Sequence, residues 1–585
     1  KETGNIYTDL RIVNKEKSND FNGYDTITFS VPDQGADFLP NFRMGDMIYM
    51  YAYNGNEEPD VRKALLFKGN LTDIHSNSLT VHLTDGQQDS SVFTDTTYAI
   101  EHSGSDASTT SAIRSLHRFI TSRQSFKDLL LAQRQPRKDE SIQLSCSYNP
   151  SYDKIILKAK QALDYFLLVG PPGTGKTSMA LQYMVRESIS SDQSILLMSY
   201  TNRAVDEICG MLTDNDIDYI RIGNEFTCDT KYKQHLLSQI IEHCPKLNVI
   251  RQRILDCKVI VGTTSTIQGK SYLFNLKHFS TVIVDEASQI LEPNIIGLLA
   301  QADSKFVLIG DYKQLPAVVQ QDSAVSSVND VSLNNICLDN CRNSLFERLI
   351  HIENANNRDE FTGVLRRQGR MHPDIAEFPN KMFYYKENLQ PVPLEHQTKK
   401  QLEYSLESID YLDDALKAHR MVFIPSRFCK EPNISDKVNS EEAKIVTDIL
   451  RRIYRFYGVK FNADKTVGVI VPYRNQISMI KKEIEKLGIP ELEDISIDTV
   501  ERYQGSQRDV IIYSFTIQNR YQLDFLTSNC FEEDDHIIDR KLNVAITRAR
   551  KQMILTGNAE ILNNDIIFKS LIEHIKSKGG YIEYE

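Results

Sequence analysis

The sequence predicts an α/β protein with two tandem parallel-sheet domains, preceded by a small β-barrel domain. Three observations support this prediction. Residues 1 to about 100 contain short strands that alternate between apolar and polar residues. From about residue 140, short apolar strands alternate with helical segments, and a second set of such strands begins after residue 350. Strands that are apolar on both faces are typical of parallel sheets covered by helices, so two sets imply two α/β domains with a cleft between them.

Residues 1–100 are expected to form the barrel as an accessory domain. Their short alternating runs are separated by Gly, Asn and Asp, which is the pattern of half-buried strands joined by turns. The runs are YDTITFSV, MGDMIYMYAY, ALLFKGNLTDI and LTVHLTD.

Residues 101–140 are expected to form a linker and connecting helices. The stretch HSGSDASTTS, which begins at His102, is rich in Ser, Thr, Asp and Gly and predicts irregular structure. Apolar residues then recur at roughly helical spacing and predict one or two helices. These residues are Leu116, Phe119, Ile120, Leu129 and Leu130.

Residues 141–350 and 351–585 are expected to form the two α/β domains. The strand candidates of the first domain are YFLLVG, SILLMSY, CKVIVGTTS, TVIVDEA and KFVLIGD. Those of the second are MVFIP, TVGVIVPY, ISIDTV, DVIIYSFT and KQMILTG. Each is short and rich in β-branched residues, as buried strands of a parallel sheet require.

A phosphate-binding loop follows the first of these strands. Residues 170–177, GPPGTGKT, fit the pattern G-x-x-x-x-G-K-[ST] and open a helical segment, which is the context that distinguishes a true P-loop from a chance match. The glycines let backbone N–H groups surround the phosphates of ATP. The candidate ATP-binding residues here are Gly173, Thr174, Gly175, Lys176 and Thr177. Lys176 is expected on the β- and γ-phosphates, and the Thr177 hydroxyl on Mg²⁺.

Two further strands end in residues suited to hydrolysis. The strand TVIVDEA ends in Asp285 and Glu286, about 110 residues beyond the P-loop, at the edge where open α/β sheets place their sites. We assign Asp285 to Mg²⁺ and Glu286 to the general base that accepts a proton from water. The strand KFVLIGD leads into GDYKQLP, whose Gln314 is suited to sensing the γ-phosphate.

Composition restricts the protein class without identifying a partner. A length of 585 residues exceeds one core and favours three to four domains. No apolar run approaches the ~20 residues of a membrane span, and the first residues resemble no secretory leader. Nine dispersed cysteines favour a reducing, cytoplasmic location. The net charge of −11 does not exclude nucleic acid, because a local groove of donors suffices to hold phosphates. Since the chain does not begin with Met, an upstream domain stays an open alternative.

Six ordered motifs carry a family resemblance. GPPGTGKT, DEASQ, GDYKQLP, QGRMHP, YQGSQRDV and LNVAITRAR, in that order, resemble the motif series of superfamily 1 helicases. The resemblance runs from about residue 145 to 560 and is strongest to the branch of the nonsense-mediated-decay RNA helicase and the replication nuclease-helicase. It implies two RecA-like motor domains, ATP hydrolysis with Mg²⁺, and 5′ to 3′ movement along a single strand. The implied partner is single-stranded DNA or RNA, with DNA favoured.

The resemblance also implies catalytic residues in the second motor domain. Arg370, in QGRMHP, and Arg548, in AITRAR, would reach across the cleft to the γ-phosphate as arginine fingers. Planar guanidinium groups stabilise the negative charge that develops during phosphoryl transfer. Gly505, in YQGSQRDV, would lie near the same phosphate.

Other matching residues are implied to contact the nucleic acid. Thr and Asn donors at strand ends hold phosphates without reading sequence. In the first motor domain these residues are Thr201, Asn202 and Thr264, and in the second they are Pro472, Tyr473, Arg474 and Thr499. The Tyr473 ring fits two roles equally well, stacking on a base or packing in the core.

Three positions depart from the family pattern. Gly369 stands where the family usually has Tyr before the first arginine finger, which removes a stacking surface near the adenine. Tyr152 aligns with an expected Gln before the P-loop, and Gln507 stands where the motif normally has Glu. These departures bear on adenine and ribose contacts and leave the γ-phosphate chemistry in place.

The leading hypothesis is therefore an ATP-dependent helicase that unwinds duplexes. An alternative is an ATP-driven translocase that remodels protein–nucleic-acid complexes without strand separation. It shares the same residues and differs in whether a wedge splits the duplex, a role for which the barrel is the candidate. A third hypothesis, a binding scaffold with an inactive ATPase, is disfavoured because Lys176, Asp285, Glu286, Arg370 and Arg548 are all present.

Overall fold

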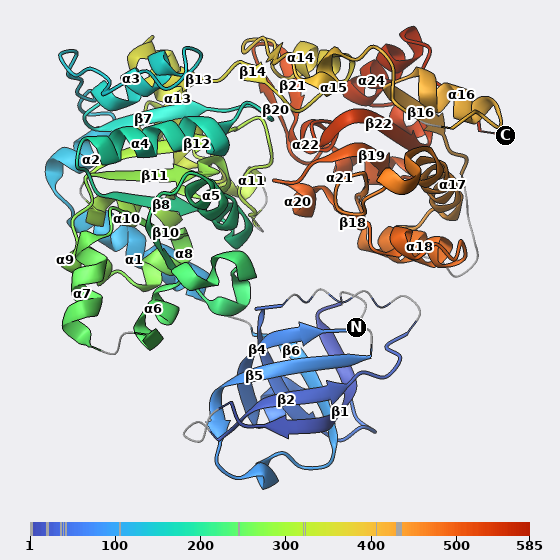
Figure 1. The fold of residues 1–585 in the computed structure, drawn as a ribbon, viewed down its shortest axis with the longest axis horizontal. Coiled ribbons are helices and arrows are strands. Elements are labelled where there is room, and N and C mark those ends of the chain that lie inside the picture. The colour runs from blue at the N-terminus through green and yellow to red at the C-terminus, as the bar shows by residue number, and fades with distance from the viewer. Residues whose placement is uncertain are drawn as a thin grey trace. The chain divides into compact units, whose positions relative to one another are not determined.

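The computed structural model describes residues 4–584 with short gaps, and Figure 1 shows its fold. The gaps are residues 19–22, 36, 37, 39, 41, 43, 76, 104–106, 244, 245, 303, 320, 322, 405 and 429–435. The chain forms two compact units. One consists of Lys1–Thr109 with Asn224–Thr230, and the other of Thr110–Gly223 with Lys231–Glu585.

The first unit is a closed antiparallel barrel with the strand order β1-β2-β5-β4-β3-β6. Its strands are β1 (Ile6–Glu16), β2 (Tyr24–Ser30), β3 (Met47–Tyr53), β4 (Leu66–Ile74), β5 (Ser78–Gln87) and β6 (Thr97–His102). Alternate residues of β2, such as Ile27 and Phe29, are fully buried inside the barrel. The segment Asn224–Thr230 also packs here, where the ring of Phe226 lies 5.7 Å from that of His82.

The expected barrel is confirmed, with two strands that the sequence patterns missed. The four expected runs form β2 to β5, while β1 and β6 complete the closure. A register shift between Ile12 and Asn14 interrupts the alternation of β1, which explains why its pattern is weak. The expected linker from His102 is shorter than predicted. His102 ends β6, residues 104–106 lie outside the described chain, and Ala107 already begins a helix.

The second unit contains two parallel sheets. The first has the order β13-β7-β12-β11-β8-β10-β9. Its strands are β7 (Tyr165–Val169), β8 (Ile195–Ser199), β9 (Tyr219–Ile222), β10 (Val259–Thr263), β11 (Thr281–Asp285), β12 (Lys305–Gly310) and β13 (Thr362–Val364). Every residue of β7, β8, β10 and β11 is buried, as a sheet covered on both faces requires. All five expected strands are present. β9 and β13 were not expected, and β13 lies beyond the expected domain boundary at residue 350.

Helices precede and surround the first sheet (Figure 1). They are α1 (Ala107–Thr121), α2 (Gln124–Leu130), α3 (Asp153–Gln161), α4 (Gln182–Ser190), α5 (Asn202–Asp214), α6 (Leu237–His243), α7 (Leu247–Asp256), α8 (Thr264–Gly269), α9 (Leu273–Leu276), α10 (Glu292–Ala302), α11 (Ser323–Ser326), α12 (Val331–Asn334) and α13 (Leu345–Ala355). The first two contain the apolar residues that predicted connecting helices. A π-helical turn, Lys176–Leu181, joins β7 and its P-loop to α4.

The second parallel sheet has the order β16-β22-β19-β17-β18. Its strands are β16 (Met421–Pro425), β17 (Val467–Val471), β18 (Ser496–Thr499), β19 (Arg508–Ser514) and β22 (Ala549–Gly557), which are the five that the sequence predicts. Two small sheets accompany it. They are formed by β14 (Arg367–Gln368) with β15 (Gln390–Pro391), and by the hairpin of β20 (Cys530–Glu533) with β21 (His536–Asp539).

The first helices of this domain precede β16, and the later ones lie between or after the strands, as parallel connections require. They are α14 (Pro373–Met382), α15 (Glu395–Thr398), α16 (Tyr411–Ala418), α17 (Ser440–Tyr457), α18 (Arg474–Glu485), α19 (Pro490–Glu493), α20 (Val500–Tyr503), α21 (Arg520–Leu526), α22 (Arg540–Ile546), α23 (Ala559–Leu562) and α24 (Ile566–Ser577). Within the described residues, no helix combines the length and apolarity that crossing a membrane requires.

Candidate active site

The P-loop runs from the carboxyl end of β7 to the turn that begins at Lys176. The Gly170 N–H donates to the Gly310 carbonyl at 2.9 Å, which fixes the loop against β12. Gly173 and Gly175 have φ angles of 72° and 75°, a left-handed conformation that favours glycine. A Cβ on Gly173 would lie 2.4 Å from the Cβ of Arg370. The loop therefore needs glycine both for its backbone shape and for the approach of Arg370.

Four polar side chains meet at the end of the P-loop. The Thr177 hydroxyl donates to Asp285 Oδ2 at 2.7 Å, and Lys176 Nζ lies 3.5 Å from Glu286 Oε1. A hydroxyl beside a carboxylate is the oxygen pair that Mg²⁺ prefers, so Thr177 and Asp285 fit the metal role that the sequence predicts. Glu286 has a left-handed φ of 53°, which places its side chain beside the P-loop lysine rather than along the strand.

The two carboxyl groups differ in their electrostatics. Asp285 is 2% exposed, and burial together with the neighbouring Glu286 raises its pKa to about 6. Burial also opposes ionisation of Glu286, but the Lys176 ammonium and the Gln289 amide outweigh it and lower the pKa of Glu286. The Gln289 amide donates to Glu286 Oε2 at 3.0 Å. Glu286 is therefore held as a carboxylate, the form that a general base requires.

Gln314 links the two sheets through its amide. Its Nε2 donates to Asp311 Oδ2 at 2.7 Å, and its Oε1 accepts from Arg548 Nη2 at 2.6 Å. Gln314 follows β12 of the first sheet, whereas Arg548 immediately precedes β22 of the second. A displacement of the Gln314 amide would therefore move or break its hydrogen bond with Arg548.

Both predicted arginine fingers lie at this site. The Arg370 Nε donates to Gln507 Oε1 at 2.9 Å, and the Gly369 N–H donates to the Gly173 carbonyl at 2.9 Å. Arg548 is 2% exposed. Burial and the nearby Arg370 guanidinium lower the pKa of Arg548 to about 9, so the side chain stays charged at neutral pH. Among the described residues, neither guanidinium forms an ion pair with a carboxylate, and both line the pocket at the P-loop.

These residues line one pocket of about 510 Å³. Its lining residues include Gly173, Thr174, Gly175, Lys176, Thr177, Glu286, Gln314, Arg370, Gly505 and Arg548. The structure thus brings together in one cavity the residues of both α/β domains that the sequence assigns to ATP. Asp285 is not part of the cavity lining but accepts a hydrogen bond from Thr177, which is. The Thr174 hydroxyl donates to the Pro171 carbonyl at 2.7 Å, so this side chain shapes the loop.

The three departures from the family pattern have defined contacts. The Tyr152 hydroxyl donates to the Thr174 carbonyl at 3.0 Å, so it supports the P-loop backbone. Gln507 accepts from Arg370, as described above. A side chain at Gly369 would meet Leu394 at 3.0 Å, which leaves little room there for a bulky ring.

Sequence analysis missed Glu207, which also lines the pocket. It lies on α5 with its side chain 48% exposed, and desolvation within the pocket raises its pKa to about 7, with Arg203 opposing and the carboxylates of Glu286 and Asp285 contributing. No motif marks this position. The sequence offers one weak signal, which is an acidic residue in the helical segment that begins just after Thr201.

The residues expected to contact nucleic acid lie at the carboxyl edges of the two sheets. In the first sheet Ser199 of β8 pairs with Thr263 of β10, so Thr201, Asn202 and Thr264 follow at the same edge. In the second sheet Val471 of β17 pairs with Thr499 of β18. Pro472, Tyr473 and Arg474 follow β17 directly, so they share that edge with Thr499.

One of these residues is buried, and the other six are half-buried or exposed. Thr264 is 4% exposed. The Tyr473 ring stacks on Phe525 with centroids 5.1 Å apart and an interplanar angle of 23°. Burial raises the pKa of Tyr473 to about 12. Thr201 caps α5 by accepting from the Ala204 N–H at 3.2 Å.

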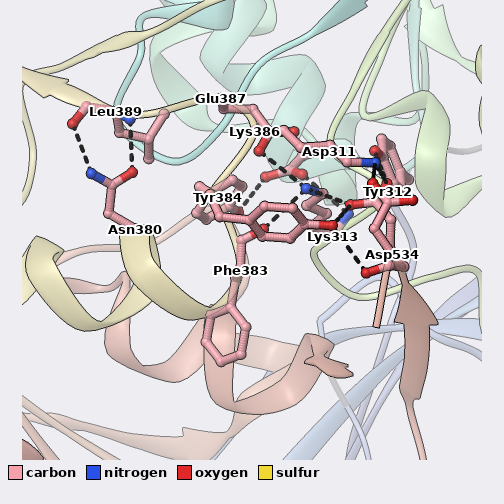
Figure 2. Close-up of polar contacts among 12 residues, drawn as sticks. Asp311, Tyr312, Lys313, Asn380, Phe383, Tyr384, Lys386, Glu387, Leu389 and Asp534 are labelled. Carbon is pink, nitrogen blue, oxygen red and sulfur yellow. Dashed lines mark hydrogen bonds and ion pairs between the residues drawn. The ribbon is translucent and has the colours of Figure 1, made fainter. Parts of the chain in front are cut away.

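A buried ion cluster joins the loop after β12 to the second sheet (Figure 2). Lys313 is fully buried, and its Nζ contacts Glu387 Oε2 at 3.0 Å, Glu533 Oε2 at 2.8 Å and the Phe383 carbonyl at 3.0 Å. Glu387 follows α14, and Glu533 ends β20. We call Lys313, Glu387 and Glu533 the Lys313 cluster. Because Lys313 is adjacent to Gln314, the cluster fixes the loop that contacts Arg548.

Neighbouring contacts reinforce this junction. The Tyr384 hydroxyl donates to Asp311 Oδ2 at 2.7 Å, and the Asn543 amide donates to both the Lys313 carbonyl and the Tyr384 hydroxyl. Figure 2 shows Tyr384 and Glu387 converging on the loop that holds Asp311 to Lys313. Leu315 of the same loop belongs to the hydrophobic core of the second sheet. The two sheets therefore share a continuous buried contact at this loop.

Removing the charge of Lys313 should destabilise the protein strongly at neutral pH. In Lys313→Met, the buried Glu387 loses its cation and Glu533 keeps only Lys386, and breaking a buried pair in this way costs about 3–5 kcal/mol. Burial already raises the pKa of Glu387 in the presence of Lys313. Without Lys313 that pKa should rise further above its unfolded value, so the folded state gains protons as pH falls. The deficit should therefore shrink from pH 7 to pH 5, which urea unfolding midpoints will measure.

Lys386→Met is the matched control. Lys386 lies 3.5 Å from Glu533 but is 41% exposed, so its loss should change the midpoint far less. Equal losses in the two variants, or a deficit for Lys313→Met that does not change with pH, would contradict a buried cluster.

Comparisons with known proteins match both α/β domains of the chain. Two family models, each described as an AAA domain, match the chain. One matches residues 147–249 and 245–322, and the other matches residues 341–560. The matched regions carry the P-loop with β11 and β12, and the second sheet with both arginines.

Three relatives illustrate the similarity. The DNA replication ATP-dependent helicase/nuclease of Arabidopsis thaliana is 30% identical over 440 residues, covering 74% of this chain. An uncharacterized ATP-dependent helicase of Methanocaldococcus jannaschii is 25% identical over 562 residues, covering 79% of the chain and 76% of the relative. A regulator of nonsense transcripts 1 homolog of Neurospora crassa is 27% identical over 455 residues, covering 71% of the chain. The chain spans only 30% and 38% of the Arabidopsis and Neurospora proteins.

Proposed function

We propose that this chain moves 5′ to 3′ along a single strand and unwinds duplexes. The proposal follows from its family. The chain belongs to the superfamily 1 helicases, which are ATP-dependent enzymes, in the branch that contains the nonsense-transcript regulator and the replication helicase/nuclease. Single-stranded DNA is the proposed track, in preference to RNA. The observation that carries the proposal is the composite pocket, in which Lys176 and Glu286 of the first sheet face Arg370 and Arg548 of the second.

In the proposed reaction each residue has a distinct role. Lys176 and the P-loop amides hold the β- and γ-phosphates, and Thr177 with Asp285 holds Mg²⁺. When bound there, Mg²⁺ would neutralise charge that develops on the phosphate oxygens. Glu286 accepts the proton of the attacking water.

Arg370 and Arg548 stabilise the charge on the transferring phosphoryl group. Because both belong to the second α/β domain, hydrolysis requires the two domains to close on ATP. Gln314, bonded to Arg548, connects the γ-phosphate to this closure. Gly505 has a left-handed φ of 82° and lines the pocket, so it lets the backbone of that motif approach the phosphate.

The proposed track follows the carboxyl edges of both sheets. Thr201, Asn202 and Thr264 hold the strand on the first sheet. Pro472, Tyr473, Arg474 and Thr499 hold it on the second. Hydroxyl, amide and guanidinium donors of this kind bind phosphates irrespective of base sequence. Closure and opening of the ATP pocket then move one group of contacts relative to the other.

We expect ATP hydrolysis to require Mg²⁺, and we expect single-stranded nucleic acid to raise its turnover rate several-fold or more. The physical reason is that Asp285, Ser199 and Thr263 end three neighbouring strands, so the ATP and track residues share one sheet edge. Steady-state turnover should be measured without nucleic acid and with single-stranded DNA or RNA of equal length. Equal rates in all three conditions would contradict a coupled motor, and stronger stimulation by RNA would reverse the preference for DNA.

The direction of movement requires a separate experiment. Duplexes with either a 5′ or a 3′ single-stranded tail should be offered with ATP, with a blunt duplex as control. Separation of the 5′-tailed duplex alone is expected. Displacement of a protein block from a single strand, without separation of any duplex, would instead support the ATP-driven translocase.

A further inference from the structure

Helix α21 carries aromatic residues on its exposed face. Gln522, Leu523 and Leu526 are buried against the domain, as expected for the inner face of an amphipathic helix. On the outer face Tyr521 is 87% exposed and Phe525 is 43% exposed. They are four residues apart, so their side chains neighbour each other along the helix. An outer helix face is normally polar, and the highly exposed Tyr521 ring is accessible to a ligand there.

The helix lies at the same sheet edge as the proposed track residues. β17 and β19 are parallel neighbours, with Ile470 paired to Tyr513. Tyr473 follows β17, and α21 follows β19 after five residues, 515–519, so both lie beyond the carboxyl ends of these strands. The stacked rings of Tyr473 and Phe525, with centroids 5.1 Å apart, show that the two segments are in contact.

The Phe525 ring is already occupied by other side chains. Tyr473 stacks on it, and Lys541 Nζ lies 3.9 Å from its centroid and donates to the Phe525 carbonyl at 3.0 Å. Phe525 thus holds Tyr473 in place. Tyr521, with most of its surface exposed, is the ring on this face that is open to a ligand.

We propose that Tyr521 is a base-stacking residue for the bound single strand, next to the Tyr473–Phe525 pair at the carboxyl edge of the second sheet. The proposal rests on the proposed function and adds a contact that lies outside the six motifs quoted above. A base is the inferred ligand, because the Tyr521 ring presents a stacking face, whereas its exposed neighbours Arg520 and Asp524 carry opposite charges. Stacking on an aromatic ring tolerates any base, which suits a motor that must move along every sequence.

The absence of tryptophan from the chain permits a direct test. Tyr521→Trp introduces a single indole at the proposed stacking position. Saturation with an unlabelled single-stranded DNA oligonucleotide should quench its fluorescence, because a stacked base quenches an indole. The binding curve from quenching should coincide with that from anisotropy of a labelled oligonucleotide.

Tyr411→Trp is the matched control. Tyr411 is 69% exposed at the start of α16, which leads into the amino end of β16, at the opposite edge of the sheet. Its fluorescence should not change when the strand binds. Strand binding by Tyr521→Trp without quenching would overturn the inference while leaving the proposed function intact. Failure of the parent chain to bind any single strand would overturn both.

A second variant separates stacking from a structural role. Tyr521→Ala should weaken strand binding about 5- to 150-fold, which corresponds to the ~1–3 kcal/mol of one base–aromatic stack. Tyr521→Phe should retain the parent affinity because it keeps the ring. On an abasic oligonucleotide of equal length, Tyr521→Ala and the parent chain should bind equally. An equal loss on abasic and normal strands would overturn the inference, because only the bases differ.

Discussion

Replacing Glu286 by Gln should preserve ATP binding and lower hydrolysis about 10²–10⁴-fold, the contribution of a positioned general base. The variant keeps the size of the side chain and its place beside Lys176, at 3.5 Å in the parent chain. It removes the carboxylate that accepts the proton of water. Turnover under saturating ATP and Mg²⁺, together with the affinity for a fluorescent ATP analogue, will separate the two effects.

Two other variants define what the Glu286 result means. Lys176→Ala should lose tight nucleotide binding, because it removes the cation of the phosphate site. Glu207→Gln removes a carboxylate from the same pocket, but one that lies on α5 and forms no ion pair with Lys176 among the contacts of the described residues. It should retain most of the activity. If Glu286→Gln kept near-normal turnover, or if Glu207→Gln lost as much activity, the general-base assignment would be wrong.

The parts of the fold that the sequence predicted are those whose signal is local. β7, β8, β10 and β11 are continuous apolar runs because both faces of the sheet are covered, and such runs are visible in one sequence. β13 has three residues, and its partner β7 lies almost two hundred residues earlier, so no local pattern marks it. β1 was missed for a different reason, since a register shift breaks its alternation.

The same distinction applies to the site. The P-loop is contiguous, so its glycines and Lys176 are recognised together. The Lys313 cluster is assembled from three distant segments. In the sequence, Lys313 lies in GDYKQLP, a polar stretch that is typical of an exposed loop. Its burial depends on Glu387 and Glu533, which come from the second domain. Only the folded chain places these carboxylates around one lysine.

Removing Arg548 should lower turnover by about 10³–10⁵-fold, the range attributed to arginine fingers. Arg548 precedes β22 of the second sheet, whereas the P-loop and Asp285 belong to the first, so this loss would test whether catalysis needs both. ATP affinity should fall much less, because Lys176, Thr177 and Asp285 remain in place. Affinity for single strands without nucleotide should hardly change. Arg548→Ala should be compared with the parent chain in all three measurements.

Arg548→Lys tests the geometry of the Arg548 side chain, and Gln314→Ala tests its contact with Gln314. Arg548→Lys keeps the charge but loses the planar fork, so turnover should recover only partly. Gln314 accepts from Arg548 at 2.6 Å, so the double variant with Gln314→Ala should be less impaired than the sum of the single effects predicts. Unchanged turnover in Arg548→Ala would refute the composite site. If Arg548→Ala lost strand binding in the absence of ATP, Arg548 would instead belong to the track. If the effects of Arg548→Ala and Gln314→Ala on turnover were additive, the two side chains would act separately.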